Sequence, residues 1–137
     1  VDGGAIAAKV STIGESRTLG YKTHGVDGWF TIFIRGMLCN WMVSMGVVGA
    51  MISTSATSKM LAMWMPVMLF FFMGFEHSIV NMFLFPFSMI MGGEFTFVDY
   101  LVWNELPTVL GNLAGGLCLV GLPLYFTHVR TSPNRSI

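Results

Sequence analysis

Residues 60–93 read MLAMWMPVMLFFFMGFEHSIVNMFLFPFSMIMGG, and their only ionisable side chains are those of the adjacent Glu76 and His77. As one helix, these 34 residues would extend about 51 Å at about 1.5 Å per residue, whereas the hydrocarbon core of a bilayer is about 30 Å thick. Two complete spans and a turn would need more than about 40 residues. The stretch therefore predicts one broken span, with two half-helices joined by an irregular segment near residues 74–80.

The composition of the chain supports a membrane protein. Hydrophobic residues make up 54% of the 137 residues and charged residues only 10%, whereas a soluble domain carries about 25% charged residues. The net charge is zero and basic residues form no run, which argues against a nucleic-acid partner. Cys39 and Cys118 both lie in apolar stretches and form no CxxC or metal-type spacing, so we interpret them as packing residues.

Two further apolar stretches predict uninterrupted spans. Residues 29–52 contain one charged residue, Arg35, near the start, where a long side chain can reach the headgroups. The last span is predicted at residues 107–127, where Gly111 and Gly115 form a GxxxG pattern that allows another helix to approach closely. We therefore expect an all-α membrane protein with about three spans and a broken middle helix.

The segments between the spans predict the topology. Residues 53–59 are a polar loop that ends in Lys59, and residues 94–106 are predicted to form an acidic loop. The positive-inside rule places Lys59 and the basic tail with Arg130 and Arg135 in the cytoplasm, and the acidic loop outside.

The expected organisation has three parts. Residues 1–27 are a weakly helical connecting segment, residues 28–130 the membrane domain and residues 131–137 a polar tail. Three crossings from an outside start are unusual for a complete protein and suggest half of an inverted-repeat fold, and the chain starts without Met. We therefore expect a fragment that lacks the first half of that fold.

Glu76 and His77 are the first candidates for function, because ionisable groups in hydrocarbon cost several kcal/mol unless they are paired or solvated. The alternative for Glu76 is structural, a carboxylate that holds the broken backbone by accepting N–H bonds. Asn81 lies one helical turn after His77, and Asn40 could meet them from the neighbouring span. Each amide could donate hydrogen bonds to an anion or could instead join helices.

The remaining candidates have weaker support from the pattern. One or two rings of the phenylalanine-rich stretch around Phe70 could form a hydrophobic constriction, although most would face lipid or the core. Lys22, before the first span, could attract anions to a pore mouth or simply be solvated. We found no nucleophile elbow, P-loop or metal-ligand cluster, so neither an enzyme nor a cofactor is expected.

Three strings closely resemble the formate/nitrite transporter family: RGMLCNWMV (35–43), PVMLFFFMGFEHSIVNMFLFP (66–86) and GNLAGGLCLVGLPLY (111–125). The GFEHS core of the second string is the most specific. The resemblance covers about residues 30–130 and fits the second half of that family's six-span subunit. It implies that the segment before it, residues 1–27, is the end of a preceding span and its connection. It implies an aquaporin-like inverted-repeat helical bundle, a homopentamer in which each subunit has its own pore, and passage of small monovalent anions such as formate and nitrite.

The resemblance also implies roles for individual residues. His77 corresponds to the central titratable group of the pore, Glu76 to the acidic residue before it, and Asn81 to the asparagine four residues later. Asn40 corresponds to the asparagine of the CNW string, and Phe70 to the ring of the inner constriction.

Lys22 is the best match to the lysine that attracts anions before the fourth span. The family lets the histidine share or transfer a proton, so transport would be pH-gated or proton-coupled, in a plasma or inner membrane. The alternatives are a non-conducting structural half-channel and a neutral-solute channel of the aquaporin type, whose usual NPA signature is absent.

Overall fold

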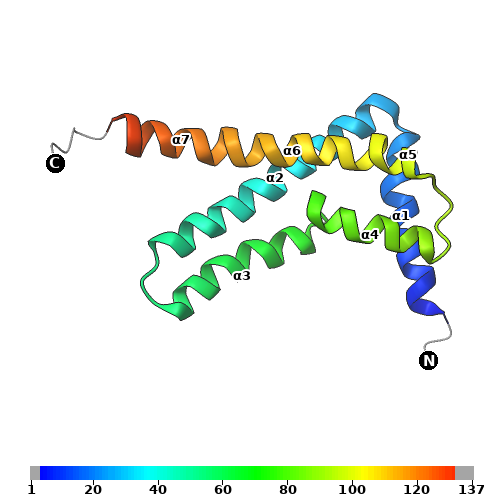
Figure 1. The fold of residues 1–137 in the computed structure, drawn as a ribbon, viewed down its shortest axis with the longest axis horizontal. Helices are drawn as coiled ribbons and strands as arrows, with labels where there is room; N and C mark the ends of the chain where they lie inside the picture. The colour runs from blue at the N-terminus through cyan, green and yellow to red at the C-terminus, as the bar shows by residue number, and fades with distance from the viewer. Residues whose placement is uncertain (1–3, 132–137) are drawn as a thin grey trace.

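The computed structural model describes residues 4–131, and within that part of the chain every regular element is a helix. Figure 1 shows a hairpin of α2 and α3 and one long helix, which runs from α5 through α6 to α7. Helix α1 lies near the α5 end of the long helix. Arg135 and nearly all of the predicted polar tail lie outside the described residues. The elements, with η for π-helical turns, are α1 (Ala5–Lys22), α2 (Gly25–Ile52), α3 (Ala56–Phe72), α4 (Ser78–Ile90), α5 (Phe97–Tyr100), η1 (Leu101–Glu105), α6 (Leu106–Gly116), η2 (Leu117–Gly121), α7 (Leu122–Leu124) and η3 (Tyr125–Arg130).

The predicted break between two half-helices is present, between α3 and α4. Gly74 ends α3 because it adopts a left-handed conformation with φ +64°. The Phe75 N–H donates to Phe70 O at 3.0 Å and the Gly74 N–H to Phe71 O at 3.1 Å, the two hydrogen bonds of a Schellman motif. The break occupies residues 73–77 and is shorter than predicted, because α4 already begins at Ser78.

The GxxxG pattern packs against α2 of the same chain. A Cβ atom at Gly111 would lie 2.2 Å from Phe33 O, and one at Gly115 would lie 2.0 Å from Met37 O. Only glycine allows the two backbones to approach this closely. The predicted role of these glycines in helix contact is confirmed, and the contact fixes α6 against α2.

The prediction of an acidic loop over residues 94–106 is wrong from Phe97 onward. Thr96 and Asp99 form a capping box that starts a helix: the Asp99 N–H donates to Thr96 Oγ1 at 3.1 Å, and the Thr96 N–H donates to Asp99 Oδ2 at 3.2 Å. The helix then continues to Arg130 for 34 residues, about 51 Å. Because that length exceeds the hydrocarbon core of about 30 Å, residues 97–105 extend beyond the apolar part predicted to span the membrane.

The segment predicted to be the end of a preceding span and its connection contains one regular helix. Residues 5–22 form the 18-residue helix α1, which packs against α4. Glu15 Oε1 accepts a hydrogen bond from the Glu94 N–H at 3.0 Å, after the end of α4. These contacts hold α1 against α4, the second half-helix of the broken span.

Two helices in the described part are long and apolar enough to cross a membrane, α2 with 28 residues and the helix from Phe97 to Arg130. The apolar helices α3 and α4 have 17 and 13 residues, which is about 26 and 20 Å. Neither reaches the roughly 30 Å of the hydrocarbon core alone, as expected for the parts of one broken span.

Candidate functional site

The break presents the His77 side chain beside Phe70. The two ring centroids are 5.8 Å apart and the ring planes are 26° apart, which is a stacked arrangement. Phe70 is only 3% exposed, whereas His77 is half-buried. The imidazole Nδ1 is buried and has no hydrogen-bond partner among the described residues. The structure thus brings together two of the residues that the sequence singled out.

Glu76 points away from solvent and is the centre of a polar cluster. Its side chain is 0% exposed, and Oε2 accepts hydrogen bonds from Asn81 Nδ2 at 2.9 Å and from Asn104 Nδ2 at 3.4 Å. Arg17 Nε on α1 lies 3.7 Å from Oε1 and compensates the buried charge. These contacts favour the structural interpretation of Glu76.

Asn81 is also 0% exposed, and its amide is fully engaged as a donor. Nδ2 donates to Glu76 Oε2 at 2.9 Å and to Asn104 Oδ1 at 2.7 Å, which uses both amide hydrogens. The expectation that Asn81 and His77 project together toward a substrate therefore differs from the observed geometry. Asn81 faces the interior cluster, and only its Oδ1 is without a partner in the described part of the chain.

Asn40 reaches the break indirectly, through Asn112 on α6. Asn40 Nδ2 donates to Asn112 O at 2.6 Å. The Asn112 side chain donates to Gly36 O and to Glu76 O, both at 3.0 Å, and its Oδ1 accepts from the Ser78 N–H at 3.1 Å. One amide thus joins α2, the irregular segment and the first turn of α4.

Lys22 lies apart from the break, at the end of α1, where its Nζ is 2.7 Å from Asp99 Oδ1. Lys22 precedes α2, and Asp99 precedes the apolar part of the helix from Phe97 to Arg130. The Lys22 ammonium, together with the Thr96 hydroxyl and N–H, lowers the pKa of the Asp99 carboxyl to about 2. The cation predicted to attract anions is therefore paired with a carboxylate, and the structure places it with Asp99 rather than with His77.

Sequence reasoning missed three polar residues that hold the break: Arg17, Asn104 and Asn112. Arg17 lies in the segment interpreted as a connection, and Asn104 in the stretch interpreted as a loop. Asn112 was visible within an apolar span, where a buried amide requires a partner. That rule was applied to Asn40 and Asn81 and could have found Asn112 as well.

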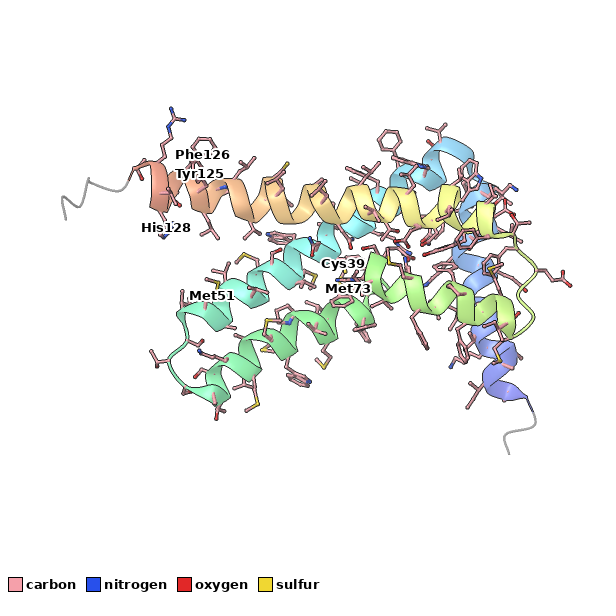
Figure 2. The ribbon with its side chains drawn as sticks, in the orientation of Figure 1. Cys39, Met51, Met73, Tyr125, Phe126 and His128 are labelled. Carbon is pink, nitrogen blue, oxygen red and sulfur yellow. The ribbon has the colours of Figure 1, made fainter. Side chains whose placement is uncertain are left out.

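A groove of about 660 Å³ follows α2 and α3 up to the break. Figure 2 labels Cys39 on α2 and Met73 directly after the end of α3. The groove is lined by Leu38, Trp41, Met42, Met45, Met65, Pro66, Met68, Leu69, Met73 and Phe75.

Among the described residues no group of three or more His, Cys, Asp or Glu side chains could hold a metal ion.

Comparison with known proteins assigns this architecture to a family. The family model described as "Formate/nitrite transporter" matches residues 2–126. The chain is 38% identical over 94 residues to formate-nitrite transporter 2 of Toxoplasma gondii, covering 69% of this chain and 20% of that protein. It is 34% identical over 102 residues to a probable formate transporter of Methanothermobacter thermautotrophicus, covering 74% of this chain and 37% of that protein.

A solved pentameric formate channel with formate bound has a similar fold, with a TM-score of 0.76 and 26% sequence identity. The similarity covers 92% of this chain and 54% of the channel chain, so this chain spans about half of that channel and a smaller share of the two relatives. The match of the family model extends over nearly all of the chain. The chain therefore belongs to the formate/nitrite transporter family.

Proposed function

We propose that this chain is the second half of a membrane subunit that transports a small monovalent anion, formate or nitrite, past His77 in the broken helix. The observation that carries the proposal is the placement of His77: an imidazole stacked on Phe70, in an irregular segment between two half-helices. Non-helical backbone at membrane depth is tolerated where it is buried in protein or lines a cavity. Family membership supports a transport role for this arrangement.

The chemistry of the break suits an anion. His77 directly precedes α4, whose N-terminal N–H groups and dipole favour negative charge. Protonation of the imidazole adds a positive charge at this point, and His77 can also donate that proton to the substrate. Transport would then be pH-gated or proton-coupled.

The other predicted residues divide into two groups in this proposal. Phe70 forms a hydrophobic constriction beside His77, and Asn40, half-buried with one amide hydrogen left after its bond to Asn112, donates to the anion. Glu76 and Asn81 hydrogen-bond each other in the interior and support the break without contacting the anion. Lys22 contributes positive potential at the pore mouth, reduced by its partner Asp99.

The proposed assembly follows from the solved formate channel that has a similar fold. The solved relative is pentameric, and this chain covers 54% of its length. We propose a homopentamer of multi-pass subunits with an aquaporin-like inverted repeat, in a plasma or inner membrane, in which the first half of the fold completes each pore. Without that half, the chain would be a non-conducting half-channel.

The test is anion uptake into proteoliposomes that contain the longest reading frame carrying this chain. Formate, nitrite, lactate and chloride would be compared, with water permeability measured in parallel. Selective uptake of formate or nitrite supports the proposal and identifies the substrate. Water permeability without anion uptake would favour a neutral-solute channel, and absence of both fluxes from folded, oligomeric protein would leave the half-channel.

A further inference from the structure

Asn104 belongs to the polar cluster around Glu76, although it is far from His77 in sequence. It belongs to the π-helical turn η1 and is 0% exposed. In this turn the Leu106 N–H donates to Leu101 O, five residues back, and Pro107 follows without an N–H group of its own. The wide turn places Asn104 and Glu105 on the buried side together.

The hydrogen bonds of Asn104, Asn81 and Glu76 form a closed triangle. Asn81 Nδ2 donates to Asn104 Oδ1 at 2.7 Å and to Glu76 Oε2 at 2.9 Å, and Asn104 Nδ2 donates to Glu76 Oε2 at 3.4 Å. Asn104 Nδ2 also donates to Arg17 O on α1 at 3.0 Å. All four amide hydrogens are therefore used, within the described part of the chain.

The triangle also fixes the orientation of both amides. If the Asn81 amide were reversed, its carbonyl oxygen would face the Glu76 carboxylate and the Asn104 carbonyl oxygen, two acceptors with which it cannot form a hydrogen bond. If Asn104 were reversed, its oxygen would face Arg17 O. The two amides thus both present donors to Glu76 Oε2, which holds this side chain in the interior.

The position of Glu76 determines the direction of His77. The segment between Phe75 and His77 is non-helical, and His77 itself is extended, with φ −121° and ψ 119°. Successive side chains of extended backbone point to opposite sides. With Glu76 held in the interior, His77 must point the other way, toward Phe70.

We propose that Asn104 is a positioning residue for His77, acting through Asn81 and Glu76. It holds the side chain of Glu76 on the interior side and thereby directs the imidazole onto Phe70. Its importance for transport rests on the proposed function, whereas its effect on the His77 ring does not.

The first experiment measures the ring contact without any anion. In the longest reading frame carrying this chain, histidine is labelled with ¹⁵N and the phenylalanine rings with ¹³C, and magic-angle-spinning NMR in lipid measures the dephasing of the His77 ring nitrogens by nearby phenyl carbons. His77→Phe assigns the His77 signals, and Phe70→Leu defines the dephasing without the stacked ring. We expect Asn104→Leu to lose the Phe70-dependent part of the dephasing, and Asn104→Ser to do the same if the leucine variant does not fold.

The matched control is Thr108→Val. Thr108 lies one helical turn after Asn104, is 0% exposed, and its Oγ1 has no partner among the described residues. This isosteric change should leave the dephasing at the wild-type value. Unchanged dephasing in the folded Asn104 variant, or equal losses in the Asn104 and Thr108 variants, would overturn the proposal.

The second experiment is a double-mutant cycle on anion uptake. We expect Asn104→Leu and Asn81→Leu each to lower the rate about tenfold, the change that corresponds to about 1.4 kcal/mol for groups left unsatisfied in the interior. The double variant should be no slower than either single variant, because both changes break the same connection. Losses that multiply to about a hundredfold would contradict action through Asn81. If the wild-type protein carries no anion, the proposed function fails and the NMR result alone decides the positioning role.

Discussion

Replacing Asn112 with leucine tests whether one buried amide holds the break in place. The change removes four side-chain hydrogen bonds of 3.0 to 3.3 Å: two that Asn112 donates, to Gly36 O and Glu76 O, and two that it accepts, from the N–H and the hydroxyl of Ser78. Interhelical hydrogen bonds in membrane proteins contribute about 0.6 kcal/mol each on average, and hydrogen bonds in soluble proteins about 1 kcal/mol. We therefore expect Asn112→Leu to lower the free energy of unfolding by about 2–4 kcal/mol.

The assay is equilibrium unfolding in mixed micelles with increasing SDS, followed by helical circular dichroism. Leucine is branched at Cγ like asparagine and is larger, so that the change leaves no cavity to add to the loss. Thr108→Val, one turn earlier on the same buried face, controls for any change at this interface and should alter the free energy by less than about 0.5 kcal/mol. A loss below about 0.5 kcal/mol for Asn112→Leu would refute the reasoning that this amide stabilises the break.

Four further results are expected. Gly115→Ala should destabilise the α2–α6 contact by about 1–3 kcal/mol in the same SDS titration, because the new Cβ would lie 2.0 Å from Met37 O; Gly121→Ala, where the nearest atom is 3.4 Å away, should not. Asp99→Asn should speed anion uptake at low ionic strength by releasing Lys22, and added salt should remove the difference. Because the pKa of Asp99 is lowered to about 2, the Lys22–Asp99 pair should stabilise the wild-type protein above about pH 4 and lose that effect as the pH falls to about 2, a change that thermal melts of Asp99→Asn should lack. In detergent, a maleimide should label Cys118, which is exposed in this chain, and leave the buried Cys39 unmodified.

The helix break was predictable because several local signals agree. A 34-residue apolar stretch is too long for one crossing and too short for two, and Gly74 directly precedes its only ionisable pair. The α2–α6 contact was predictable for a similar reason, since Gly111 and Gly115 leave one face of the helix bare. In both places sequence pattern and tertiary packing require the same structure.

The acidic helix start and the interior cluster were harder to recognise. Residues 97–105 carry Asp99 and Glu105, and their charge suggested a loop, although the Thr96–Asp99 capping box starts a helix there. The partners of Glu76 come from positions 17, 81 and 104, and no local pattern relates residues so far apart. The direction in which the Asn81 amide points depends on those partners, so the sequence alone predicted a donor for the substrate where the fold uses both hydrogens internally.

The most direct test of the account is the pH dependence of formate and nitrite uptake in proteoliposomes with wild-type protein and His77→Phe. His24→Phe, an exposed histidine at the start of α2, is the matched control. The account predicts that the wild-type and His24→Phe proteins take up the anion with a rate that changes between about pH 5 and about pH 7, and that His77→Phe loses this dependence. An unchanged rate and pH profile in His77→Phe would show that the histidine of the broken helix does not control transport.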